Sequence, residues 1–126
     1  MAHAARLAPD WPAQSLTFQS KMADSLSPYA RSFYGGKTIW LTGASSGIGE
    51  AMALALAACP CRLILSARRE AELERVAAAC RAAGPALVHV LPIDLADATR
   101  LPTQAQAALA LGNGRLDVLI HNAGVS

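Results

Sequence analysis

The fold is decided by the stretch Leu41-Thr42-Gly43-Ala44-Ser45-Ser46-Gly47-Ile48-Gly49-Glu50. It follows a strand-like apolar run over 38–42 and opens a helix-like run from Ile48 to Ala58. Its three glycines let the backbone turn tightly and approach a ligand without an intervening Cβ atom. The helix that follows presents unpaired N–H groups and the positive end of its dipole, which suit a pyrophosphate. The stretch therefore predicts a dinucleotide-binding turn.

From Lys37 onward, strand-like and helix-like segments alternate along the chain. The patterns predict strands at 38–42, 63–65, 87–91 and 117–121, and helices at 48–58, 70–83 and 102–111. Gly84-Pro85 ends the helix at 70–83 in the manner of a C′ glycine followed by proline. Alternating strands and helices form a parallel sheet with right-handed crossovers. We expect an α/β fold: a Rossmann-type doubly wound sheet truncated to its first four strands, in the order 3-2-1-4.

Residues 1–36 differ from the rest of the chain. They are rich in Ser and Ala, contain three prolines and show no sustained period, which predicts a poorly ordered N-terminal extension. Scattered basic residues weakly resemble an organelle transit peptide, whereas Asp10 and Asp24 count against one, so both interpretations stay open. We expect two parts, this extension at 1–36 and an incomplete Rossmann half-domain at 37–126.

The composition excludes several classes of function. The net charge is +2 and no predicted helix carries a stripe of Lys and Arg, which argues against a nucleic-acid partner. No window approaches the ~18–20 apolar residues that span a bilayer, so we expect no transmembrane segment.

The cysteines Cys59, Cys61 and Cys80 are odd in number, and no secretory leader is evident. We interpret them as reduced thiols of an intracellular protein. Cys59-Pro60-Cys61 lacks a second pair of ligands, so we predict no metal site. We expect a cytoplasmic location, with organelle targeting by residues 1–36 or membrane association as the alternatives.

Candidate binding residues fall at the carboxyl ends of the predicted strands, where parallel α/β sheets bind their ligands. They are the Gly turn, Ser66-Ala67-Arg68-Arg69, Asp94, and Asn122-Ala123-Gly124. A lone Gly-rich turn occurs in many folds. Four groups at successive strand ends together favour a dinucleotide site.

Arg68 and Arg69 point to the kind of dinucleotide. An NAD-binding fold places an Asp or Glu at the end of the second strand to accept a hydrogen bond from the ribose 2′-OH. Ser66 and Ala67 stand there instead, and a guanidinium pairs well with a 2′-phosphate. We therefore expect NADP(H) ahead of NAD(H). The alternative is an ordinary solvated Arg pair at the start of a helix.

Several neighbouring residues have two interpretations each. Asp94 suits either a hydrogen bond from the adenine amino group or a turn. Asn122 suits either a bridge between strands or a turn, and Ser45 and Ser46 suit phosphate oxygens or turn chemistry. His89 and His121 lack a carboxylate or nucleophile in the local pattern, so we interpret both as structural.

These motifs resemble the signature series of the short-chain dehydrogenase/reductase superfamily: residues 42–49, Asp94-Leu95 and Asn122-Ala123-Gly124. The run Leu65-Ser66-Ala67-Arg68-Arg69 is similar to that of NADP-preferring members, in particular the "member 7" dehydrogenase/reductase branch, which acts on steroid, retinoid and other carbonyl compounds. The resemblance implies pyrophosphate at the glycines, 2′-phosphate at the arginines, adenine at the aspartate, and ribose at the Asn-Ala-Gly turn. The residues it implies at the cofactor are Gly43, Ser45, Ser46, Gly47, Ile48, Gly49, Arg68, Arg69, Asp94, Leu95, Asn122, Ala123 and Gly124.

His121 departs from the family, which usually has a further Asn at this position. We expect the change to alter local hydrogen bonding more than cofactor choice. The family's catalytic Tyr, Lys and Ser would follow Gly124, so we expect no catalytic residue within this chain. Tyr29 and Tyr34 cannot replace the Tyr, because neither has a Lys four residues later.

The resemblance implies an NADP(H)-dependent short-chain oxidoreductase that reduces a carbonyl or oxidises a secondary alcohol. Its partners would be that small-molecule substrate and further copies of the chain in a homo-oligomer. We expect this cofactor-binding fragment to be inactive alone. One alternative is a truncated, non-catalytic protein that binds nucleotide or pairs with a subunit through the apolar edge at 118–120. Another is a fragment without a stable fold.

Overall fold

The computed structural model describes residues 32–45, 47–94 and 96–122. Most of the predicted N-terminal extension therefore lies outside the described residues. The same holds for four predicted cofactor residues, namely Ser46, Leu95, Ala123 and Gly124.

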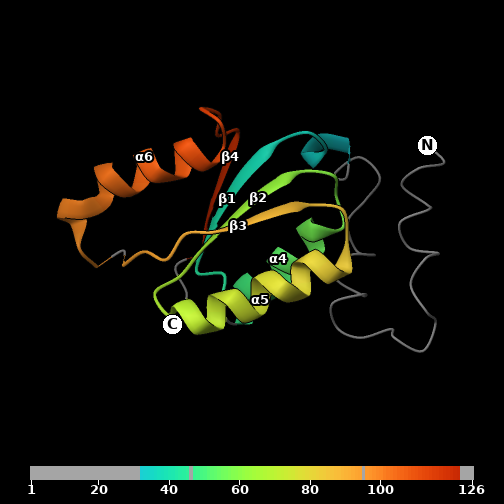
Figure 1. Ribbon diagram of the computed structural model, residues 1–126, viewed down its shortest axis with the longest axis horizontal. Coiled ribbons are helices and arrows are strands. Elements are labelled where there is room, and N and C mark those ends of the chain that lie inside the picture. Colours follow the sequence, from blue (N-terminus) through green and yellow to red (C-terminus); the bar gives the residue numbers. More distant parts are fainter. Residues whose placement is uncertain (1–31, 46, 95, 123–126) are drawn as a thin grey trace.

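The described chain forms a four-stranded sheet with helices on both faces (Figure 1). In order, the elements are β1 (Thr38–Thr42), α4 (Gly47–Ala57), β2 (Arg62–Ser66), α5 (Glu70–Ala83), β3 (Leu87–Val90), the 3₁₀ turn η2 (Ala98–Arg100), α6 (Leu101–Leu111) and β4 (Val118–His121). Every strand pair is parallel, and the strand order is β3-β2-β1-β4. The α/β class and the order 3-2-1-4 predicted from the sequence are confirmed.

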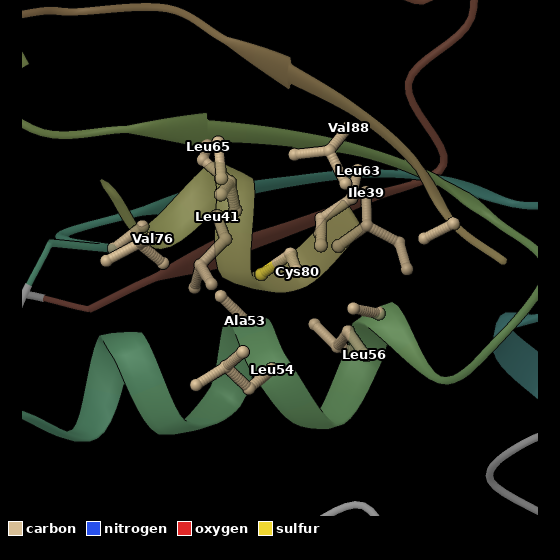
Figure 2. Packing of buried hydrophobic residues seen from close by; sticks show 14 of the residues in the cluster. Ile39, Leu41, Ala53, Leu54, Leu56, Leu63, Leu65, Val76, Cys80 and Val88 are labelled. Carbon is tan, nitrogen blue, oxygen red and sulfur yellow. The ribbon is translucent and has the colours of Figure 1, made fainter. Parts of the chain in front are cut away.

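The larger core lies between the sheet and the helices α4 and α5. Alternate strand residues point to this face, so Ile39, Leu41, Leu63 and Leu65 are completely buried there. Figure 2 shows them packing toward side chains of both helices, with Cys80 among them. The central strands are buried on both faces, as expected for a parallel sheet and for their continuous apolar sequences.

The opposite face of the sheet is covered by α6 (Figure 1). Trp40 and Ile64 form a smaller cluster there with Ile93 and with Ala108 of α6. The indole Nε1 of Trp40 donates a hydrogen bond of 2.8 Å to Ser66 Oγ, so the polar atom of this buried ring has a partner.

The strand β4 lies at one edge and pairs with β1. Val118 and Ile120 are half-buried against the larger core, whereas Leu119 points to the other face and is 60% exposed. This confirms the apolar edge at 118–120 for the part of the chain that the structure describes.

Gly84 differs in conformation from the C′ glycine that the sequence suggested. It follows α5 with φ −170° and ψ −174°, which is extended backbone rather than the left-handed cap of a Schellman motif. A Cβ on Gly84 would collide with the carbonyl oxygen of Ala57. The absence of a side chain therefore serves the close packing of the ends of α4 and α5.

The three cysteines are buried thiols, and no disulfide joins them within the described residues. In the same part of the chain, no three His, Cys, Asp or Glu side chains are grouped to hold a metal ion. None of the described helices is both long and apolar enough to cross a membrane.

Candidate cofactor site

The structure gathers the predicted binding groups at the carboxyl edge of the sheet. Three hydrogen bonds hold them together across strands. Ala44 N in the Gly turn donates to Ser66 O at 3.1 Å, and Ile93 N donates to Ala67 O at 3.0 Å. Asn122 Nδ2 donates to Gly43 O at 3.1 Å. The segments after β1, β2, β3 and β4 therefore form one continuous rim.

The Gly turn and Asn122 lie at the switch point of the sheet. From β1, the chain continues on one side to β2 and β3, and after β3 it crosses to β4 on the other side of β1. Crevices at such reversals are where open α/β sheets bind dinucleotides. The geometry thus places the Gly turn where a dinucleotide would cross the sheet.

The motif glycines are required by backbone conformation and by close packing. Gly43 and Gly47 have φ of +66° and +59°, in the left-handed region that favours glycine. A Cβ on Gly43 would collide with the carbonyl oxygen of Asn122, and one on Gly49 with the carbonyl oxygen of Gly43. A Cβ on Gly49 would also lie only 2.6 Å from Asn122 Nδ2.

The turn leads directly into α4, whose amino end is open to solvent. Gly47 is exposed, and a Cβ on it would meet no atom within 4 Å beyond its chain neighbours and the adjacent helix backbone. Ile48 is 72% exposed. Ser45 is buried, with 3% exposure. An open helix amino terminus behind a glycine-rich turn is the arrangement that binds a pyrophosphate. The residues present therefore fit a dinucleotide.

The end of β2 separates buried residues from exposed ones. Ser66 is fully buried with its hydroxyl bonded to Trp40, and Ala67 is also buried. Arg68 and Arg69 are exposed, and Arg69 precedes α5 with extended dihedrals and no side-chain capping bond. The side chains at this strand end that can reach a bound ligand are thus the two guanidinium groups.

Asp94 forms a turn. Its Oδ1 accepts a hydrogen bond of 3.0 Å from Ala96 N, and its carbonyl accepts one of 3.2 Å from Asp97 N. Of the two interpretations of Asp94, the structure shows the turn. A contact with adenine stays a prediction for this half-buried residue.

His121 and Asn122 join β4 to β1 with two adjacent side-chain bridges. Thr42 Oγ1 and His121 Nδ1 lie 2.9 Å apart in a hydrogen bond, one residue before the Asn122–Gly43 contact. Asn122 acts as the bridge between strands that the sequence suggested. His121 supports the same junction, in keeping with its structural interpretation.

His89 lies outside the rim, in the middle of β3. Arg62 Nη1 donates to His89 Nε2 at 2.9 Å and, at 3.4 Å, to the carbonyl of Leu111 at the end of α6. Burial lowers the pKa of His89, and the charges of Arg62 and Arg81 lower it further. A neutral ring that accepts from Arg62 is a structural partner, as predicted.

Two contacts of the site could not be inferred from the local sequence pattern. They are the bonds Trp40–Ser66 and Thr42–His121, each between different strands. Both depend on the parallel register. It pairs Thr42 with His121, and it pairs Trp40 with Ile64, so that Trp40 lies diagonally across from Ser66.

Comparison with known families agrees with this geometry. The family model described as short chain dehydrogenase matches residues 37–126. The chain belongs to the short-chain dehydrogenase family. Within this family of oxidoreductases, it corresponds to the cofactor-binding portion.

Individual family members show the extent of the similarity. The human protein "Dehydrogenase/reductase SDR family member 7" is 45% identical over 91 residues, which are 70% of this chain and 26% of that protein. The member-7-like protein of Drosophila melanogaster is 45% identical over 94 residues, 72% of this chain and 28% of that protein. This short-chain dehydrogenase chain thus spans about a quarter of the length of these relatives.

One similar solved structure shares the fold and contains a nicotinamide cofactor. L-sorbose reductase from Gluconobacter frateurii, in complex with NADPH and L-sorbose, has a TM-score of 0.65 at 28% identity, covering 73% of this chain and 35% of that one. Other matched structures of the family contain NAD, so the family as a whole uses either nicotinamide dinucleotide.

Proposed function

We propose that this chain binds NADP(H) and is the cofactor-binding part of an oxidoreductase that reduces a carbonyl or oxidises a secondary alcohol. The observation that carries the proposal is the packing of Gly43 and Gly49 against Asn122 at the switch point, beside two exposed arginines. Family membership supports the oxidoreductase class. The reaction and the preference for NADP(H) are our proposals.

The pyrophosphate would lie on the amino end of α4, against Gly43, Gly47 and Gly49. The exposed Ile48 would cover one side of it, and Ser45 would stabilise the turn from within. The Asn122 turn would run past the adenosine ribose, and Asp94 would face the adenine. Each group lies on the carboxyl rim of the sheet, the side on which α/β folds bind dinucleotides.

Arg68 and Arg69 support the preference for the phosphorylated cofactor. Charge-assisted bonds from a guanidinium to a phosphate are strong and bidentate. No carboxylate stands at the end of β2 to repel a 2′-phosphate, since the residues there are Ser66 and Ala67, both buried. The two arginines also lie next to the amino end of α5, where a bound anion is favoured electrostatically.

The bound nicotinamide would supply the hydride chemistry. The residues described here would bind and orient the cofactor. The sequence contains no Tyr followed four residues later by Lys, so we propose that groups outside it supply proton transfer and carbonyl polarisation.

The cofactor preference is tested with Arg68→Ala. Losing a hydrogen-bonded charge pair costs about 1.5–3 kcal/mol, so the Kd of NADPH should rise about 10- to 100-fold while that of NADH changes little. The control is Arg115→Ala, which removes the same charge from an exposed residue before the start of β4 and breaks its ion pair with Asp117. It should lower stability without changing the ratio of the two Kd values. An equal weakening of both cofactors by Arg68→Ala would overturn the assigned role.

A further inference from the structure

Ser66 is held at two atoms by different parts of the molecule. Its Oγ accepts from Trp40 Nε1 at 2.8 Å, and its carbonyl oxygen accepts from Ala44 N in the Gly turn at 3.1 Å. Ser66 is the last residue of β2 and is 0% exposed. The position of the strand end is therefore fixed relative to both β1 and the phosphate turn.

Trp40 is a rigid anchor for this contact. It lies in the middle of β1, which pairs with β2 on one side and β4 on the other. Its ring is 7% exposed and packs with Ile64, Ile93 and Ala108. A buried indole N–H requires an acceptor, and Ser66 Oγ is that acceptor. Neither partner can move away without leaving a buried polar group unpaired.

The contact lies two residues before Arg68. The backbone around Arg68 is attached through its neighbours, because Ala67 O accepts from Ile93 N at 3.0 Å and Arg69 O accepts from Leu73 N at 3.0 Å. Ser66 provides the attachment on the side of the Gly turn. The distance between the guanidinium of Arg68 and the pyrophosphate turn thus depends on how Ser66 is held.

We propose that Trp40 and Ser66 are positioning residues that set cofactor selectivity by holding Arg68 in register with the Gly turn. This inference rests on the proposed preference for NADP(H). Ser66 does not act by touching the ribose, since its side chain is fully buried and directed to Trp40. The two residues act through the backbone that leads to Arg68.

The test compares Trp40→Phe, Ser66→Ala and the double variant, each in the full 126-residue chain. For each protein, the Kd values of NADPH and NADH are measured by nicotinamide fluorescence, and the unfolding midpoint is measured in urea. Each single variant leaves one buried polar group without its partner and should lower the midpoint. The double variant removes both groups, so its stability should largely recover.

The ratio Kd(NADH)/Kd(NADPH) separates positioning from stability. We expect it to fall about three- to tenfold in both single variants and to stay low in the double variant, within the range of coupling between contacting residues. A ratio that recovers together with stability in the double variant would show a merely structural role and overturn the inference. If the single variants do not fold, the ratio Kd(NADH)/Kd(NADPH) of the double variant alone tests the positioning role.

The same Kd values for the wild-type chain and for Arg68→Ala distinguish a failure of the NADP(H) preference from a failure of the positioning role. A wild-type chain that binds both cofactors equally overturns the NADP(H) preference and this inference with it. A wild type that prefers NADPH, loses the preference with Arg68→Ala and keeps it in the Trp40→Phe/Ser66→Ala double variant retains the proposed function. That result overturns only the positioning role.

Discussion

The side chain of Asn122 donates a 3.1 Å hydrogen bond to the carbonyl of Gly43, and the carbonyl of Asn122 occupies the space that a Cβ on Gly43 would need. The two residues lie at the ends of the adjacent strands β4 and β1. The close approach of the Asn122 carbonyl depends on glycine at position 43, because any Cβ there would collide with it. This pair and the neighbouring Thr42–His121 bond together join β4 to β1 at the switch point of the sheet.

Gly43→Ala should destabilise the fold and abolish cofactor binding. Alanine at a φ of +66° costs about 1–2 kcal/mol, and overpacking against Asn122 adds about 1–3 kcal/mol. The free energy of unfolding in urea should therefore fall by roughly 2–5 kcal/mol.

Gly36→Ala is the matched control for Gly43→Ala. Gly36 has a similar φ of +76°, but a Cβ on it would meet no atom within 4 Å beyond its chain neighbours. Gly36→Ala should therefore lower the free energy of unfolding only by the cost of the left-handed conformation, about 1–2 kcal/mol. Equal losses at the two positions would show that the contact with Asn122 does not constrain the turn.

Asp117 should make the fold sensitive to acid. Its carboxylate accepts from Thr38 N at 2.8 Å and from Arg115 Nε at 2.9 Å, and these bonds lower its pKa. Because the pKa is lower in the folded state, the stabilisation is complete above the ordinary value of about 3.9 and is lost as the pH falls below it. Asp117→Asn should lower stability at pH 7 and flatten the decline at low pH.

Urea midpoints at pH 7 and pH 3.5 measure the effect at Asp117. Glu74→Gln is the control, since Glu74 is exposed and its carboxylate makes no hydrogen bond or ion pair within the described residues. If Asp117→Asn and Glu74→Gln change the pH dependence equally, the contacts with Thr38 and Arg115 do not stabilise the fold.

Cys61 and Cys80 should be unreactive in the folded protein. The pKa of both thiols is raised to about 12, chiefly by burial, and the neighbouring Cys59 contributes to the rise at Cys61. A thiol reagent at pH 8 should therefore modify them only as fast as the protein unfolds, with the rate rising in urea. Rapid modification of both in the absence of denaturant would contradict their burial.

Ionisation of the same two thiols should lower the free energy of unfolding at alkaline pH. Their pKa is raised in the folded state, so their contribution is complete below the ordinary value of about 8.5 and decreases as the pH rises from there toward 12. Cys80→Ala should reduce the decrease in urea midpoint between pH 8 and pH 10. An unchanged alkaline decrease would mean that other groups cause it.

Leu119 should promote self-association of the 126-residue chain through β4. An edge strand with an exposed apolar side chain is a template for further pairing, and a Lys at such a position prevents it. Leu119→Lys should reduce concentration-dependent light scattering while changing stability by no more than about 0.5 kcal/mol. Leu101→Lys, at a 40% exposed position on α6, should leave the scattering unchanged. Equal effects would indicate a general gain in solubility instead of a specific edge.

Local patterns predicted the elements, because apolar runs and turn residues report burial and chain reversal directly. The order of the strands was predicted from the Rossmann-type fold that the Gly turn and the alternation of elements indicated. The Gly turn and Asn122 came together as expected. The bonds Trp40–Ser66 and Thr42–His121 were not predicted, because they depend on the register between strands. The need for glycine at position 84 comes from the nearness of Ala57, another long-range contact that periodicity along one segment cannot report.

The central claim, that the Gly turn and the amino end of α4 hold the pyrophosphate of NADP(H), is tested most directly by titrating the purified chain against NADPH. Nicotinamide fluorescence should change saturably with the wild-type chain, and the change should be absent with Gly43→Ala. A wild-type chain that gives no response at millimolar NADPH would contradict the account.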